Sequence, residues 1–250
     1  MSTRRSMLRQ VGMEALVDVD VPDTWPEATR AWVREHAAAL DGSTEFTCDL
    51  EIEAVEEARF RATFGQQMLL AYHCTRLYRE EIEDIRAEGL RMLDRQLVAD
   101  RIGRAIDRGQ LVAEARARVE SGNVYTINNT AGREGQTCLI VGRSLFGYDT
   151  GCHPLLEHWG GEALRGGPGP AHSLAGIGVP TIVVVRLSAA RVWERARSGP
   201  HLANVFVGVL LGLDDASAAL HFRDHVRARD IVGFWQPGMP VYDRHVRLPR

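Results

Sequence analysis

The sequence predicts an α+β protein in which a helical N-terminal segment, residues 1–66, precedes a domain built around a mixed or antiparallel sheet, residues 67–250. Two observations support this prediction. Helix-type patterns dominate the first part of the chain, whereas apolar and β-branched runs collect in the second part. Strands and helices also lack the regular alternation of a doubly wound parallel sheet, so the α+β class follows.

Start and stop signals define the expected helices. Before the first helix, residues 23–27 supply a capping residue, a first-turn proline and an acidic residue. A later helix begins with a cluster of acidic residues and ends at Gly89, a suitable C-cap. The expected helices cover residues 28–40, 78–89, 95–107 and 111–120. Along the third of them and at its end, Arg101, Arg104 and Arg108 are expected on a solvated face.

Apolar and β-branched runs bounded by turn residues define the expected strands. The expected strands cover residues 68–75, 124–127, 137–141, 180–187, 230–235 and 241–243. Residues 181–185 are β-branched throughout and give the clearest strand signal. Residues 203–213 are apolar and fit either a helix or a strand, whereas the Gly- and Pro-rich residues 165–171 indicate a loop.

The charged residues exclude several kinds of chemistry. All 30 basic residues of the 250-residue chain are arginines, and lysine is absent. Schiff-base catalysis, a pyridoxal-phosphate anchor, a Walker-type phosphate loop and a protein-kinase site all need a lysine and are therefore excluded. The formal net charge of −3 argues against extended nucleic-acid binding, although a local arginine patch remains compatible with it.

Cysteine usage and hydropathy indicate a cytoplasmic protein without a membrane segment. The cysteines lie at positions 48, 74, 138 and 152, without a C-x-x-C pair, and are expected to be reduced and mostly buried. The histidines lack metal-ligand spacing, so no metal site is expected. The longest apolar stretches fall short of the roughly 20 residues that span a bilayer, and no signal-peptide pattern is visible.

The segment 72–77, Tyr-His-Cys-Thr-Arg-Leu, carries the main functional signal. On a strand, His73 and Thr75 face the same side, and Cys74 points into the core. This strand, the following helix with Ile82 and its Gly-Leu end resemble the first motif of the ADP-ribosyltransferase superfamily. The resemblance implies that His73 and Thr75 hold a ribose of NAD.

The same resemblance implies a second motif, an aromatic or serine residue on a later strand beside the nicotinamide. Two residues remain as alternatives for this role. Tyr125 supplies an aromatic ring within residues 124–127, and Ser144 follows the better strand at 137–141.

The third motif of the superfamily is a glutamate that stabilises the oxocarbenium-like charge as nicotinamide leaves. Glu162, directly after the Gly160-Gly161 pair, is the candidate. The two glycines beside Trp159 allow close backbone approach to a flat ligand, and Trp159 is expected among the ligand-binding residues. Asp243 is the alternative late carboxylate, because in much of the superfamily the glutamate lies on a late strand.

The resemblance implies an enzyme that uses NAD as a substrate and transfers ADP-ribose to a macromolecule, or hydrolyses NAD. A bacterial toxin or defence effector is one setting for such an enzyme. Without lysine, the pyrophosphate must be held by arginine or backbone amides, and Arg76 and Arg143 are the candidates. The alternatives are a non-catalytic nucleotide-binding or protein-interaction domain and an NAD-dependent RNA 2′-phosphotransferase.

Overall fold

The protein is built around a seven-stranded sheet. The computed structural model describes residues 16–40, 50, 52–127, 132–147, 151–164, 174–198 and 202–246. The strand order is β6-β7-β4-β2-β5-β9, and β1 pairs with β2 at its side. The strands of this sheet are β1 (Leu16–Val17), β2 (Met68–Leu77), β4 (Thr137–Val141), β5 (Val179–Ser188), β6 (Ala196–Ser198), β7 (Ala218–Phe222) and β9 (Ile231–Trp235). Neighbouring strands run antiparallel except β1 and β2, which are parallel, so the predicted α+β class is confirmed.

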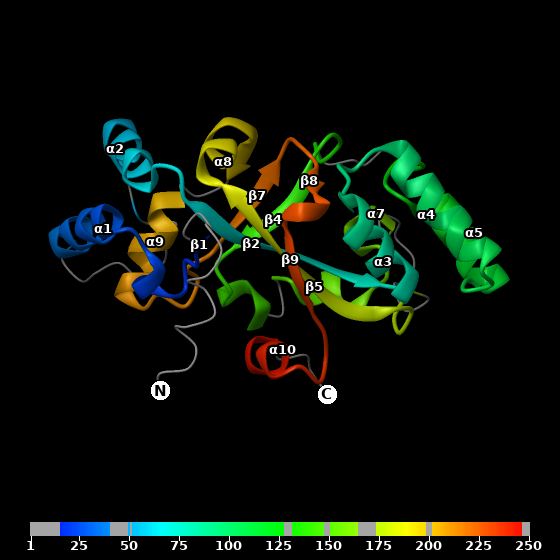
Figure 1. Cartoon of the computed structure of the whole chain (residues 1–250). Coiled ribbons are helices and arrows are strands. Elements are labelled where there is room, and N and C mark those ends of the chain that lie inside the picture. Colours follow the sequence, from blue (N-terminus) through cyan, green and yellow to red (C-terminus); the bar gives the residue numbers. More distant parts are fainter. Residues whose placement is uncertain are drawn as a thin grey trace.

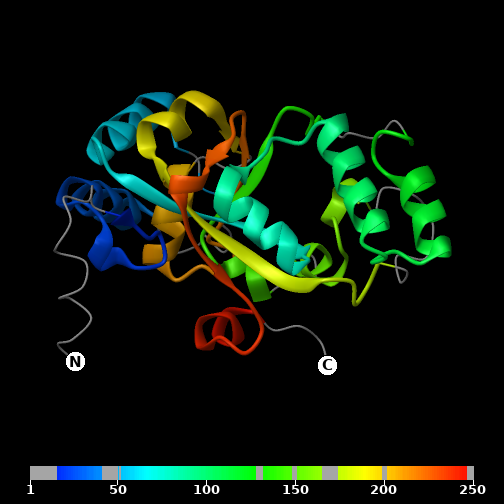
Figure 2. The same ribbon diagram turned by 45° about the vertical axis from the view of Figure 1, so that its right-hand side comes forward.

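Helices surround the sheet at both of its ends (Figures 1 and 2). The α-helices are α1 (Glu27–Ala39), α2 (Ala54–Phe64), α3 (Arg79–Glu88), α4 (Arg95–Asp107), α5 (Ala113–Gly122), α6 (His153–Glu157), α7 (Gly161–Leu164), α8 (Ala189–Arg195), α9 (Leu202–Leu211) and α10 (Pro240–His245). Single 3-10 turns lie at Pro22–Thr24, Ser144–Gly147 and Ala228–Asp230. Helices α1, α2, α8 and α9 gather near the start of β2, and α4 and α5 lie beyond its end.

Strand β2 is the centre of the sheet. It pairs with β5 over its whole length, from Met68 opposite Ser188 to Leu77 opposite Val179. On its other edge, β1 covers the first two residues, and within the described chain β4 meets β2 at the single pair Tyr72–Ile140. Residues of β2 beyond Tyr72 therefore have a ladder partner on the β5 side, and the side chain of His73 contacts the β4 backbone on the other.

Glycine ends helix α3 and lets a small second sheet form beside it. Gly89 has a φ of 90°, which L side chains rarely adopt. Strand β3 (Gly89–Leu90) pairs there with β8 (Val226–Arg227), and a Cβ on Gly89 would lie 1.9 Å from the carbonyl oxygen of Val226. The C-cap role predicted for Gly89 is confirmed.

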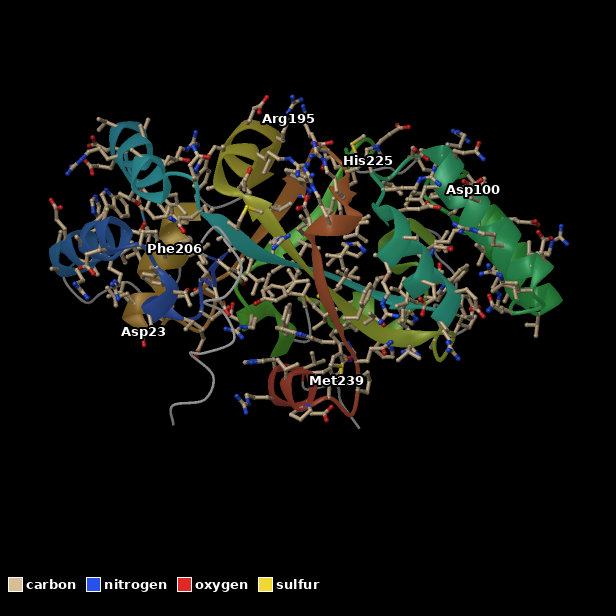
Figure 3. The ribbon with its side chains drawn as sticks, viewed as in Figure 1. Asp23, Asp100, Arg195, Phe206, His225 and Met239 are labelled. Carbon is tan, nitrogen blue, oxygen red and sulfur yellow. The ribbon has the colours of Figure 1, made fainter. Side chains whose placement is uncertain are left out.

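The N-terminal helices share a hydrophobic core with the sheet. Phe60 and Phe64 of α2 and Phe206 of α9 make aromatic contacts with centroids 5.2 to 5.3 Å apart, and Trp25 packs on Phe206 at 4.9 Å. Figure 3 shows Phe206 on α9 beside α1 and α2. The same core includes Val183 of β5. The boundary expected at residues 66/67 is thus a change of secondary structure within one core.

Two smaller apolar clusters complete the packing. One lies between the sheet and α6 and α10 and includes Tyr72, Cys74, Cys152 and Tyr242. The other lies among α4, α5 and α7 and includes Trp159. The helices α6 and α10 therefore pack on the sheet, whereas α4, α5 and α7 form an apolar cluster of their own beyond the end of β2.

The strand predicted over residues 124–127 is wrong. These residues form a turn after α5. The side chain of Asn123 explains the difference, because its Oδ1 accepts from the backbone N–H groups of Tyr125 and Thr126, both at 3.1 Å. An Asx turn of this kind uses locally the amides that a strand would offer to a neighbour.

The strand predicted over residues 241–243 is also wrong, because this segment belongs to α10. Pro240 occupies the first turn, where its fixed φ favours a helix. The apolar segment 203–213, which fits either structure in sequence, forms α9 over most of its length. Within the described ranges, no helix combines the length and apolar character needed to cross a membrane.

Candidate functional site

The imidazole of His73 lies on β2, just past the point where β4 meets that strand. Its Nδ1 is 2.8 Å from the backbone carbonyl oxygen of Cys138 on β4. A carbonyl oxygen only accepts hydrogen bonds, so Nδ1 carries a proton and donates it. In the neutral ring, Nε2 is then an acceptor.

The surroundings of His73 favour its neutral form. Burial lowers the pKa of His73 and outweighs the Cys138 carbonyl, which acts in the opposite direction; the positive charge of Arg101 on α4 lowers the pKa further. The ring is therefore uncharged at pH 7 and presents Nε2 as an acceptor for a hydroxyl donor.

Thr75 lies two positions after His73, so both side chains point to the same face of β2. The Thr75 residue is 4% exposed, and its hydroxyl donates to the Arg76 carbonyl over 3.4 Å, a long hydrogen bond. Cys74, between them, points to the opposite face and lies in the cluster under α6. The structure thus places imidazole and hydroxyl side by side, in the orientation expected from the sequence.

A buried ionic cluster lies where β2 ends and α3 begins. The carboxylate of Glu81 on α3 accepts from Arg101 Nε, from Trp159 Nε1 at 3.0 Å and from the backbone N–H of Tyr78 at 2.8 Å. Arg101 Nη2 also donates to the backbone carbonyl of Arg76 at 3.0 Å. The cluster therefore connects α3, α4 and the segment of Trp159 to the end of the strand that carries His73.

The solvated position expected for Arg101 is wrong. Its side chain is 18% exposed, because this position of α4 faces α3. Arg104 makes a second ion pair across the same interface, with Asp84. Burial alone would raise the pKa of Glu81, but Arg101 and the other donors hold it below its usual value. Arg101 has no sequence motif of its own, so the fold alone reveals its place beside His73.

The guanidinium of Arg76 is used inside the protein. Its Nε donates to the carbonyl of Ile177 at 2.8 Å, Nη1 to that of Leu156 at 3.1 Å and Nη2 to that of Gly178 at 2.7 Å. These bonds tie β2 to α6 and to the segment before β5. The structure therefore gives Arg76 a role in holding these segments together, in place of the pyrophosphate contact expected from the sequence.

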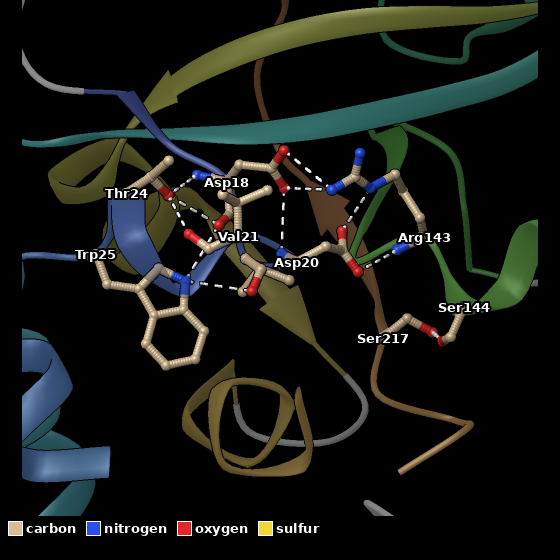
Figure 4. A network of polar contacts seen from close by, with 9 residues as sticks. Asp18, Asp20, Val21, Thr24, Trp25, Arg143, Ser144 and Ser217 are labelled. Atoms are coloured by element: carbon tan, nitrogen blue, oxygen red, sulfur yellow. Dashed lines mark hydrogen bonds and ion pairs between the residues drawn. The ribbon is translucent and has the colours of Figure 1, made fainter. Parts of the chain in front are cut away.

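Arg143 and Ser144 lie in a different polar network (Figure 4). Arg143 Nε donates to Asp20 at 2.9 Å, and its Nη2 contacts both carboxylate oxygens of Asp18 at 3.1 and 3.2 Å. Ser144 donates to the hydroxyl of Ser217 at 2.7 Å. Burial raises the pKa of the Tyr72 hydroxyl; the charge of Asp18 raises this pKa further, and that of Arg143 lowers it. The Tyr72 side chain points to the face of β2 opposite His73. The structure does not bring Arg143 and Ser144 to His73.

Trp159 is fully buried and its ring is covered. Tyr78 packs on it with centroids 5.3 Å apart, and the guanidinium of Arg101 lies 5.2 Å from its centroid. Together with the Glu81 hydrogen bond, these contacts make Trp159 part of the ionic cluster. Its ring supports Arg101 and is not an open surface for a ligand.

Tyr125 lines a groove of about 420 Å³ between α4 and α5. The guanidinium of Arg95 lies 5.0 Å from the centre of its ring. Helix α4 stands between α5 and α3 in both ribbon views (Figures 1 and 2), and His73 is not among the residues that line this groove. The turn of Tyr125 is nevertheless joined to α7 by a 3.0 Å hydrogen bond from Val124 N to the Ala163 carbonyl.

The two candidate carboxylates differ in their positions. The backbone of Glu162 belongs to α7, three residues after Trp159, but its side chain lies outside the described residues. Asp243 is exposed on α10 and accepts from the backbone N–H of Gly238 at 3.0 Å. Glu162 therefore lies in the part of the chain that contacts Arg101, whereas Asp243 caps a turn at the other side of the molecule (Figure 1).

Neither a search for a metal site nor comparison with known proteins assigns a function to this site. In the part of the chain that the structure describes, no three His, Cys, Asp or Glu side chains are grouped so as to hold a metal ion. No family model, curated protein or solved structure matches the chain. What the site can do chemically therefore rests on its own geometry: an uncharged imidazole acceptor and a threonine hydroxyl on one face of a central strand, next to a buried arginine.

Proposed function

We propose that the chain binds NAD through His73 and Thr75 and breaks the bond between nicotinamide and ribose, transferring ADP-ribose to a macromolecule or to water. The observation that carries this proposal is the fixed tautomer of His73. Because Nδ1 donates to the Cys138 carbonyl, Nε2 is an acceptor matched to a ribose hydroxyl.

The surroundings of His73 fit a nucleotide ligand in two further respects. Thr75 can donate its hydroxyl to a stronger acceptor than the Arg76 carbonyl, since that bond spans 3.4 Å. Arg101 supplies a positive charge near His73 while its own ion pair with Glu81 fixes its position. The hydroxyl of Thr75 and the guanidinium of Arg101 thus add polar groups beside His73 that suit a nucleotide.

The chemical step needs a carboxylate opposite the ribose, where positive charge develops as nicotinamide leaves. Glu162 remains the proposed residue, because α7 adjoins the Trp159–Arg101 contacts. Asp243 and Ser144 are not carried into the proposal, because both lie away from the face of His73.

Two substitutions of His73 separate binding from folding. An asparagine side chain can keep the donor to the Cys138 carbonyl but lacks a group at the Nε2 position, whereas glutamine reaches the Nε2 position and lacks the Nδ1 donor. We expect His73→Asn to weaken NAD binding at least tenfold in calorimetry, and His73→Gln to retain part of it. Thr126→Val, on the turn beyond α4, is the matched control and should bind like the parent protein.

Nicotinamide release from labelled NAD tests the reaction itself. Glu162→Gln should abolish release while leaving NAD affinity within about twofold. Equal turnover in Glu162→Gln would remove this residue from the mechanism, and unchanged affinity in His73→Asn would remove the proposed binding site.

A non-catalytic nucleotide-binding protein is the second candidate. The observation that favours it is that neither candidate aromatic ring is placed to stack on nicotinamide beside His73. The ring of Trp159 is covered by Arg101 and Tyr78, and Tyr125 lines the groove between α4 and α5. This candidate predicts binding of NAD and of ADP-ribose with a similar increase in the melting temperature and no release of nicotinamide.

A further inference from the structure

Cys74 and Cys152 meet in the core on the face of β2 opposite His73. Cys74 is 4% exposed on β2, and Cys152, directly before α6, is 1% exposed. The thiol of Cys152 lies close enough to that of Cys74 to raise its pKa, and both residues belong to the same apolar cluster between β2 and α6. Both are free thiols. Two cysteines separated widely in sequence are therefore held side by side by the fold.

The backbone on both sides of this contact is well fixed. Cys74 pairs with Ile182 in the β2–β5 ladder. The N–H of Cys152 donates to the Leu145 carbonyl at 3.1 Å, and the Cys152 carbonyl accepts from Leu156 at 3.1 Å in the first turn of α6. Two residues beyond Cys74, Arg76 donates to the Leu156 carbonyl and holds α6 on β2 a second time. The thiols are thus kept together by bonds that do not involve sulfur.

We propose that Cys74 and Cys152 are a redox-active dithiol that a peroxide converts to a disulfide in the folded protein. One thiolate attacks hydrogen peroxide, giving a sulfenic acid and hydroxide, which is protonated to water. The second thiol then displaces a second water and forms the S–S bond. Two thiols and one peroxide thus yield one disulfide and two waters. The proposal is independent of NAD binding.

The other cysteines provide an internal comparison. Cys138 lies on β4, 3.8 Å from the Nδ1 of His221, and Cys48 lies outside the described residues. Burial raises the pKa of Cys74, so the thiolate is scarce and oxidation is expected to be slow at pH 7. The rate should rise about tenfold for each pH unit while the thiol remains mostly protonated.

The experiment uses the full chain with Cys48→Ser and Cys138→Ser, which leaves only the proposed pair. After treatment of the folded protein with hydrogen peroxide, we expect loss of both thiols, a mass lower by two hydrogens, a linked peptide containing residues 74 and 152, and a raised melting temperature. Dithiothreitol should reverse all four changes. Adding Cys152→Ser should instead leave Cys74 as a single thiol that forms no intramolecular link.

A second measurement covers the case in which the double variant does not fold. The unaltered chain is then oxidised and its disulfides are mapped by peptide mass spectrometry, with a Cys74–Cys152 link expected. A folded protein that keeps both thiols under conditions that oxidise them after unfolding overturns the proposal. A mapped link from Cys74 or Cys152 to any other cysteine overturns it as well.

Discussion

The imidazole of His73 makes folding sensitive to pH. Folding lowers the pKa of this ring below the ordinary histidine value of 6.5, so the unfolded chain takes up a proton first as pH falls. The stability linked to His73 is therefore fully present above pH 6.5 and is lost as pH falls toward the pKa of the folded state. His221 and His245, whose pKa values burial also lowers, add to the same trend.

The first prediction follows from this sign. The free energy of unfolding, measured by urea denaturation, should decrease between pH 7 and pH 5, and the decrease should be smaller in His73→Asn. An equal slope in the two proteins would contradict the buried, neutral state of the His73 ring.

The ion pair of Arg101 and Glu81 gives a second prediction. Their side chains are 18% and 11% exposed, so removing one partner leaves a buried charge without its main counter-ion. Arg101→Met should lower the free energy of unfolding by about 3–5 kcal/mol, as is typical for a broken buried pair. The double variant Arg101→Met with Glu81→Gln should recover part of this loss in a double-mutant cycle.

An exposed pair on the neighbouring helix is the control for this measurement. Arg86 and Glu83 of α3 are 55% and 58% exposed in their side chains. Arg86→Met should therefore change stability by no more than about 1 kcal/mol. Comparable losses in the Arg86 and Arg101 variants would show that the Arg101 pair is effectively solvated.

At the scale of elements, two glycines, one directly after α3 and one within α4, predict opposite effects of the same substitution. Gly89→Ala should destabilise the protein by at least about 2 kcal/mol, because a positive φ costs about 1–3 kcal/mol and the new methyl would meet the Val226 carbonyl. Gly103→Ala, within α4, places its methyl in open space and should stabilise the protein by about 0.5–1 kcal/mol.

Thermal unfolding followed by circular dichroism measures both variants. The substitution is identical at the two positions, so the difference between the variants reports the positive φ of Gly89 and its close contact with β8. A small effect of Gly89→Ala would mean that this second sheet opens readily.

For the whole molecule, the shared aromatic core predicts that residues 67–250 do not fold independently. Removing α1 and α2 takes away Phe60 and Phe64 and exposes Phe206 to solvent. The shortened chain should show no cooperative melting transition, whereas the full chain should show one. Cooperative melting of the shortened chain would establish the independent domain that the sequence predicts.

Much of the fold can be predicted from the sequence because local signals agree with it. The strand of His73, the helix after it, its Gly89 end and the β-branched strand at 181–185 all carry their patterns within a few residues. Tyr125 lies in a turn instead of a strand because one side chain, that of Asn123, captures two backbone amides. Whether a side chain or a neighbouring strand binds these amides depends on local geometry, which the pattern of apolar residues does not predict.

The candidate site is less accessible to sequence reasoning, because its residues come from distant segments. His73 and Thr75 can be predicted together because both lie on one strand. Arg101 comes to the end of this strand from α4 and donates to the Arg76 carbonyl. The side chains of Arg76 and Arg143 donate to carbonyls and carboxylates elsewhere. The groups that an arginine contacts depend on which segments the fold brings next to it, and local sequence patterns do not predict them.

The pairing of β2 with β5 also determines when the protein can fold during synthesis. The pair in this ladder with the smallest separation along the chain is Leu77 and Val179, so β2 leaves the ribosome long before its partner strand is synthesised. At typical rates of translation this interval is roughly 5–20 s. During this interval the apolar strand β2 lacks its β5 neighbour, so its exposed edge and side chains are available to a chaperone.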